Sequence, residues 1–170
     1  MKKTLSLFSL LILFFFAACD KKEDPVINTV VPSFKATKND VAWISTFSWG
    51  NYIKAEKKFH ITGTKRDSQY YQEEQLGFSF YLSDVLRSST ITHFNAEWDY
   101  IIGGDAVSDV YRLDSTTAST NSIQLTAIDT ISKHISGTFT IKLIRDKNYS
   151  NKGEIIQYKN GQFDLKYVEI

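Results

Sequence analysis

Apolar and polar residues alternate one by one through much of the chain after residue 33. The longest such run extends from Ile135 to Leu143, where Ser136, Thr138 and similar residues separate the apolar positions. Neighbouring side chains in a β-strand point to opposite faces, so this pattern predicts strands with one buried and one exposed face. Strands of this kind are typical of antiparallel sheets. Comparable runs occupy residues 58–62, 78–83, 93–100, 123–127 and 162–167.

Turn-forming residues separate these runs. Gly103-Gly104-Asp105 predicts a turn before a strand near residues 110–113. Asn160-Gly161 predicts a type I′ hairpin between strands at 155–158 and 163–167, because both residues tolerate positive φ. Residues 70–75 and 83–87 are each expected to form a short helical turn. The fold class is therefore expected to be all-β, with a single antiparallel β-sandwich or barrel-like domain of about 9–10 strands.

The first eighteen residues have the layout of a secretory signal peptide. Lys2 and Lys3 precede an apolar run from Leu5 to Phe16, and small residues follow at 17 and 18. The run is shorter than the roughly 20 residues that a membrane-spanning helix needs, so a transmembrane anchor is the weaker interpretation. We expect residues 1–18 to be a signal peptide, residues 19–32 to be a tether and residues 33–170 to be a β-rich domain.

Cys19 directly follows Ala17-Ala18 and is the only cysteine of the chain. This arrangement resembles the lipobox of bacterial lipoproteins, although Phe16 stands where an aliphatic residue is usual. The resemblance implies a diacylglycerol group on the thiol of Cys19 and cleavage before this residue, so that acyl chains (palmitate or similar) would attach the protein to a lipid bilayer. The alternative is a secreted protein with an incidental cysteine at this place.

Five charged residues, Asp20 to Asp24, follow the cysteine. They resemble the export signal of surface lipoproteins from Bacteroidota-type bacteria, and they also suit a simple hydrophilic spacer. We expect a lipid-anchored location in the cell envelope, at the outer membrane, on its periplasmic or its surface face.

Composition excludes several classes of function. With 20 basic and 19 acidic side chains the chain is near neutral, and no basic block suits a nucleic-acid partner. Lys54, Lys57 and Lys58 form the densest basic group, which Glu56 interrupts. Once Cys19 is acylated no thiol remains for disulfides, zinc–thiolate sites or cysteine nucleophiles.

Five titratable residues deserve separate consideration as chemical groups. His60, His93 and His134 are too far apart in the chain for a local metal pair, and each is expected to be solvated or hydrogen-bonded. Glu97 and Asp99 share one face of a strand, about 6–7 Å apart, near the separation of glycosidase carboxylates. Two solvated acids on an outer face are the simpler interpretation.

Other motifs give no catalytic or metal site. Asp105, Asp109 and Asp114 have spacings that differ from a calcium-binding loop, and aspartates are common at turns. The chain contains no G-x-S-x-G, S-x-x-K, G-x-G-x-x-G or phosphate-binding loop. We therefore expect no enzyme, no catalytic residue, no metal site and no cofactor.

Aromatic residues are the remaining binding candidates. Trp43, Trp49 and Tyr52 are the aromatic residues whose faces the pattern leaves open, with Trp49 and Tyr52 placed in a loop or at a strand end. They could stack on sugar rings or line a small-ligand pocket, or they could pack at the edge of the core. They are the predicted ligand-contact residues.

The C-terminal half also carries a family resemblance. The segments are Ile135-Ser136-Gly137-Thr138-Phe139 and a last strand from Asn160 to Tyr167, with Phe34-Lys35-Ala36 and Trp43 near the start. Together they resemble a small Bacteroidota-type lipoprotein family with a C-terminal β-domain of unknown function. The resemblance implies a lipid-anchored β-domain and implies no activity.

Three functions are compatible with these features. The first is a non-catalytic binding or interaction module on the envelope, for a glycan, a protein or a small apolar ligand. The second is a structural or accessory lipoprotein that docks on a larger complex. The third is a hydrolase that uses Glu97 or Asp99.

Overall fold

The computed structural model describes residues 33–67, 69, 71–117, 120–147 and 153–170. Cys19, the expected signal peptide and the expected tether lie outside these residues. A short helix, α1 (Leu82–Arg87), and a 3-10 turn at Ser115–Thr117 accompany eleven strands. The strands are β1 (Ser33–Lys38), β2 (Val41–Ile44), β3 (Phe47–Ile53), β4 (Lys58–Asp67), β5 (Gln72–Tyr81), β6 (Thr90–Ile91), β7 (Asn95–Ile102), β8 (Ala106–Leu113), β9 (Ser122–Asp129), β10 (His134–Arg145) and β11 (Ile155–Glu169).

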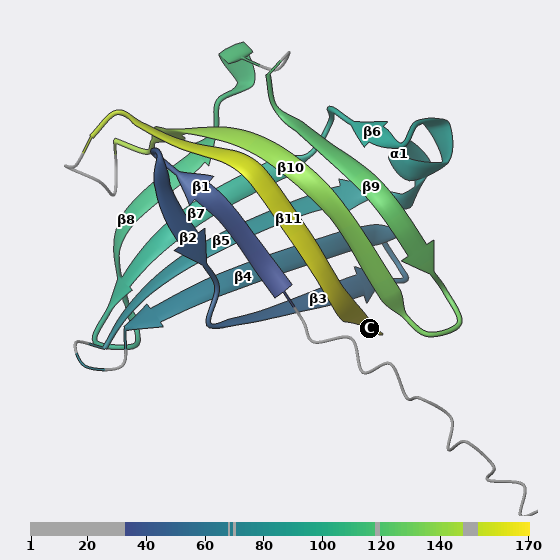
Figure 1. The fold of residues 1–170 in the computed structure, drawn as a ribbon, viewed down its shortest axis with the longest axis horizontal. Coiled ribbons are helices and arrows are strands. Elements are labelled where there is room, and N and C mark those ends of the chain that lie inside the picture. Colours follow the sequence, from purple (N-terminus) through teal and green to yellow (C-terminus); the bar gives the residue numbers. More distant parts are fainter. Residues whose placement is uncertain (1–32, 68, 70, 118–119, 148–152) are drawn as a thin grey trace, which may run out of the picture.

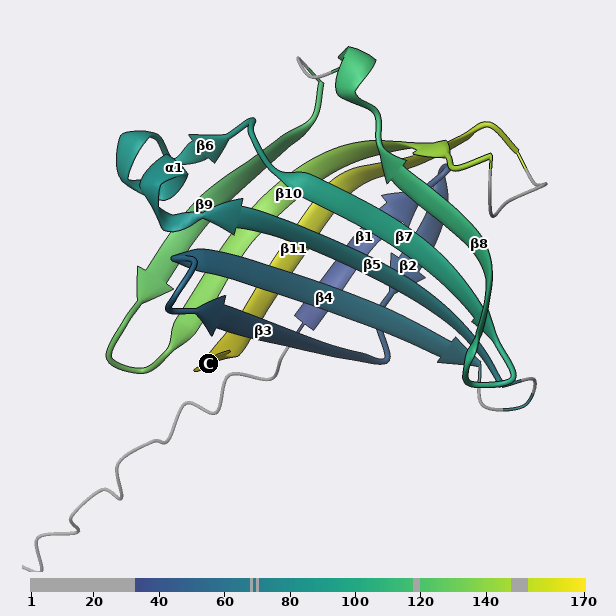
Figure 2. The same cartoon turned by 180° about the vertical axis from the view of Figure 1, so that it is seen from behind.

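One continuous sheet folds over on itself into two layers (Figure 1). The first layer has the order β2-β1-β11-β10-β9-β6, and the second, seen from its outer side in Figure 2, has the order β3-β4-β5-β7-β8. The layers join at two corners. The outer edge of β11 pairs with β1 and then, at Tyr167–Glu169, with β3. The outer edge of β10 pairs with β9 and then, at Leu143–Arg145, with β8.

This architecture confirms the predicted all-β class and its mostly antiparallel pairing. Among the strand pairs of the described residues, only β11 and β3 run parallel. The strand number slightly exceeds the expected one, because β2 and β6 are short edge strands of four and two residues. The helical turn predicted over 83–87 is present as α1. None of the helices in the described part of the chain is long and apolar enough to cross a bilayer.

Aromatic rings from both layers meet in the core between them. The rings of Phe34 and Phe78 lie 5.8 Å apart between centroids, and those of Phe78 and Phe139 lie 5.4 Å apart. These residues come from β1, β5 and β10, so the contacts hold the two layers together. Burial of each such ring contributes roughly 1.5–3 kcal/mol to stability. The alternating pattern places these rings inward because each sits in the apolar row of its strand.

Two local predictions were wrong. Asn160-Gly161 is no hairpin, since β11 continues through it from Ile155 to Glu169. Asn160 has a φ of 52° and lies beside a register shift against β10, which makes this a β-bulge. A Cβ atom on Gly161 would lie 2.4 Å from the ring of Phe139, so packing requires glycine here. The helical turn expected over 70–75 is also wrong, because β5 begins at Gln72 (residue 70 lies outside the described part).

Two other turns follow the residues that favour them. Asn39 and Asp40 have φ values of 46° and 64° between β1 and β2, as a type I′ hairpin requires. Gly103 and Gly104, at φ 69° and 91°, turn the chain between β7 and β8, as predicted.

Candidate functional site

The three predicted aromatic ligand contacts lie in different environments. Trp43 is 1% exposed, its ring packs edge-on against Phe34 and Tyr158, and its Nε1 donates a hydrogen bond to Glu74 Oε2 over 2.9 Å. It belongs to the core, which was the alternative that the sequence left open. The structure therefore keeps this ring away from any surface ligand.

Trp49 and Tyr52 lie within strand β3 rather than in a loop. Because they are three residues apart, their side chains point to opposite faces. Tyr52 packs inward, with its ring 4.6 Å from that of Phe59. Trp49 lies on the outer face, half-buried and stacked on Phe47 at 5.5 Å. Trp49 also pairs with Thr62 of β4.

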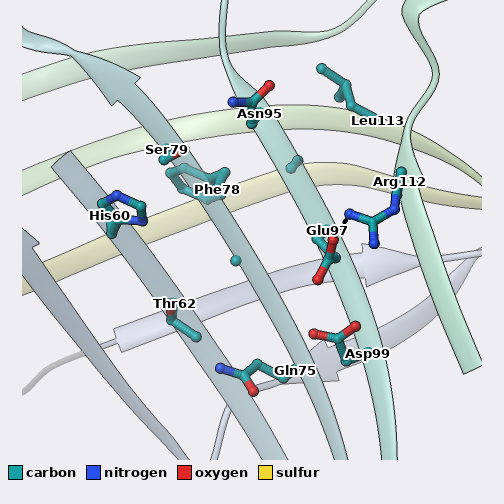
Figure 3. Close-up of a pocket in the computed structure, with 12 residues that line it drawn as sticks. His60, Thr62, Gln75, Phe78, Ser79, Asn95, Glu97, Asp99, Arg112 and Leu113 are labelled. Atoms are coloured by element: carbon teal, nitrogen blue, oxygen red, sulfur yellow. Dashed lines mark hydrogen bonds and ion pairs between the residues drawn. The ribbon is translucent and has the colours of Figure 1, made fainter. Parts of the chain in front are cut away.

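A hollow of about 470 Å³ opens on the outer face of the second layer, beside Thr62 (Figure 3). We name it the outer-face groove. Its wall comes from β4, β5, β7 and β8, and it is lined by His60, Thr62, Gln75, Gly77, Phe78, Ser79, Asn95, Ala96, Glu97, Asp99, Arg112 and Leu113.

Gly77 explains why a hollow forms on this strand face. It lies between Thr62 of β4 and Glu97 of β7 in register, in a row that elsewhere carries side chains. A Cβ atom here would meet only Thr62 Oγ1 at 3.5 Å and a backbone oxygen at 3.9 Å. The missing side chain therefore leaves space that the surrounding polar side chains border.

Glu97 and Asp99 both face this groove from β7. Burial and the neighbouring charge of Glu97 raise the pKa of Asp99 to about 6, while Arg112 opposes the shift. A hydrogen bond between the two carboxyl groups further raises the pKa of Asp99. Arg112 forms an ion pair with Glu97, and its Nε lies 3.0 Å from Asp146 Oδ2. The pair is thus a hydrogen-bonded, half-buried cluster rather than two solvated acids.

This geometry differs from that of glycosidases. Their carboxyl groups lie about 5 Å or more apart, so that a sugar or a water molecule fits between them. Here the two groups contact each other, and Glu97 is engaged by Arg112. The pair therefore lacks the gap between carboxyl groups that glycosidases use.

The histidines do not converge. His60 lines the groove, and its Nε2 is buried with no hydrogen-bond partner among the described residues. Burial, followed by the charge of Lys58, lowers its pKa. His134 contacts Asp164 on the outer face of the first layer. His93 lies in the segment between β6 and β7, where its Nδ1 lies 3.4 Å from Thr92 Oγ1.

The aspartates considered for calcium are separated by the fold. Asp105 lies in the turn before β8 and Asp114 lies just after it, at opposite ends of an eight-residue strand. Asp114 is buried, with Lys142 Nζ 3.2 Å from its Oδ2. In the part of the chain that the structure describes, no three His, Cys, Asp or Glu side chains group together as metal ligands.

Sequence reasoning considered Glu97, Asp99 and His60, favoured solvated or hydrogen-bonded roles for them, and did not predict the hollow that they line. It also gave no site role to Gly77, Gln75, Asn95 and Arg112, which are among the other lining residues. The available signal was Gly77, a glycine in the polar row of a predicted strand, which often marks a close approach or a gap.

Comparison of the chain with protein-family models, with curated protein sequences and with solved structures gives no match. The resemblance to a small lipoprotein family therefore stays a prediction from the sequence.

Proposed function

We propose that the protein is a lipid-anchored, non-catalytic binding module of the cell envelope, and that its outer-face groove binds carbohydrate. The position of Cys19 after Ala17-Ala18 supports acylation and attachment to a bilayer. The charged residues 20–24 support a place at the outer membrane. Residues 19–32 would then separate the β-domain from the membrane surface.

The composition of the groove wall carries this proposal. Gln75 and Asn95 contribute amides, and Thr62 and Ser79 contribute hydroxyl groups. Sugar hydroxyls both donate and accept hydrogen bonds, so they need a wall that offers both kinds of group. Trp49, beside Thr62, adds a half-buried aromatic ring, against which the apolar face of a sugar can stack. Few precisely placed polar groups and an aromatic ring are the usual parts of a ligand site.

Other ligand classes fit this wall less well. A peptide that extends a sheet needs a free strand edge, whereas the backbones of β4, β5 and β7 pair on both sides. A polyanion needs clustered positive charge, whereas Arg112 lies between Glu97 and Asp146. A neutral polyhydroxyl ligand avoids both difficulties.

The test is a glycan-binding array with the complete mature chain, followed by titration of any glycan that binds. We expect Trp49→Ala to weaken binding about tenfold, equivalent to roughly 1.4 kcal/mol. Tyr71→Ala is the matched control, because Tyr71 is an exposed aromatic residue that neither lines the groove nor is a register partner of a residue that lines it. Unchanged affinity of the Trp49 variant would exclude a contact between Trp49 and the ligand, and the absence of any bound glycan would refute the carbohydrate assignment.

The anchor needs its own experiment. Cells that produce the wild-type chain should incorporate labelled palmitate into it and retain it in the membrane fraction. Cys19→Ser should abolish the label and release the protein into the soluble fraction. Retention of label in that variant would exclude Cys19 as the acylated residue.

A further inference from the structure

The outer-face groove does not end at Asn95. A second hollow of about 630 Å³ begins there and shares Ser79, Asn95 and Leu113 with the first. It continues toward α1, where Asp84 and Arg87 line it. The two hollows therefore adjoin each other at Ser79 and Asn95, and the second also reaches the buried residues Phe94, Asp114 and Asn121.

We infer that the two hollows form one extended site for a linear oligosaccharide, which the protein contacts through more than one sugar ring. This inference rests on the proposed carbohydrate function and adds a minimum ligand length to it. At about 3.3 Å per residue, Asn95 and Asp99 alone lie about 13 Å apart along β7. The second hollow extends the site beyond Asn95, so a single pyranose ring cannot contact both ends.

An aromatic residue lies in or near each hollow. Trp49 does not line the first hollow but is the β3 register partner of Thr62, which does, and Tyr81, which is 48% exposed, lines the second. Thr62 and Lys58, the β4 partner of Tyr81, are four residues apart on the same strand. The two rings therefore lie at different levels along the strands, and each is placed to stack on a different sugar of one chain.

The charges of the second hollow suit the same ligand. Asp84, Arg87 and Asp114 line the second hollow, and Glu97, Asp99 and Arg112 line the first, so each hollow holds two carboxyl groups and one guanidinium group. A chain of neutral sugars can form hydrogen bonds with these groups along the whole length without adding charge of its own. An anionic polymer would meet carboxylates at both ends, which makes it the less favourable occupant.

The experiment measures how affinity depends on chain length, using the complete mature chain in lipid nanodiscs. The probes are size-graded α- and β-linked glucose oligomers and β-linked N-acetylglucosamine oligomers, from monosaccharide to hexasaccharide. For the series that binds, we expect the hexasaccharide to bind about tenfold more tightly than the disaccharide. Tyr81→Ala and Arg87→Ala should each remove most of that gain and leave disaccharide binding unchanged. Trp49→Ala should weaken the binding of both the disaccharide and the hexasaccharide.

The outcomes separate the two proposals. Equal affinity for short and long oligomers would overturn the extended site and leave the groove itself intact. The same holds if Tyr81→Ala and Arg87→Ala weaken disaccharide and hexasaccharide binding equally. Failure of every oligomer to bind would refute the carbohydrate assignment and with it the extended site. Tyr71→Ala again serves as the control, and thermal unfolding shows that each variant is folded.

Discussion

Lys38 of β1 and Glu74 of β5 form an ion pair across the two layers, with Nζ 2.7 Å from Oε2. The same oxygen accepts the Trp43 hydrogen bond, and the Lys38 ammonium lies 4.0 Å from the centroid of a Trp98 ring. Burial, and secondarily the charge of Glu74, holds the pKa of the Tyr158 hydroxyl well above its usual value. Glu74 is thus the polar centre of one end of an otherwise apolar core.

Removal of this centre should destabilise the fold. We expect Glu74→Ala to lower the free energy of unfolding by about 2 kcal/mol, because Lys38 and Trp43 lose a partly buried acceptor. The control is Glu73→Ala on the same strand, whose partner Arg66 is half exposed. That pair should contribute less than about 1 kcal/mol. Urea unfolding measures both, and equal losses would show that the cross-layer pair has no special role.

Gly161 should tolerate no side chain. Gly161→Ala places a methyl group where the Phe139 ring lies, so we expect a loss of about 1–3 kcal/mol from overpacking. Gly77→Ala should change stability by less than about 1 kcal/mol, since its Cβ would meet only ordinary contacts. Thermal unfolding of the two variants compares them directly. A stable Gly161 variant would mean that the Phe139 ring can move without cost.

The space above Gly77 should be needed for binding rather than for folding. We expect Gly77→Val to fill the groove and weaken glycan binding at least about tenfold, with the unfolding temperature nearly unchanged. Thr138→Val, at an exposed position on the outer face of the first layer, adds the same side chain away from the groove. Normal binding by the Gly77 variant, if it is folded, would exclude the groove as the ligand site.

Asp99 should make stability depend on pH in the acidic range. Its pKa is about 6 in the folded state and about 4 when unfolded, so the folded chain binds the extra proton between these values. Stability should therefore fall as pH rises from 4 to 6. Asp99→Asn should remove this slope and add about 1 kcal/mol at pH 7, a figure reduced for solvent screening of a half-exposed group.

A carboxyl titration followed by NMR checks the cause. Glu97→Gln should bring the pKa of Asp99 down toward its ordinary value, because the neighbouring negative charge is removed. If the pKa of Asp99 stays at about 6 in that variant, burial alone causes the shift. A pKa near 4 in the wild-type protein would contradict the half-buried arrangement of the pair.

Local sequence patterns determined most of the strands, the short helix and the turn at Gly103-Gly104. Alternation around Phe78, Trp98 and Ile135 follows from the geometry of a single strand, and so does the positive φ of Gly103 and Gly104. None of this depends on which strands are neighbours. The same local information misjudged Asn160-Gly161, because only the ring of Phe139, some twenty residues earlier, explains that glycine.

Only the tertiary structure decided where the groove lies and which of the three predicted aromatic residues lies on the same face of the sheet. Trp43, Trp49 and Tyr52 have the same local character, yet strand pairing and face parity leave only Trp49 on the outer face. Gly77, Glu97 and Thr62 come from three strands, so their shared hollow depends on the register between them. Register is a long-range property, and for that reason residues that are unremarkable in sequence together line the hollow.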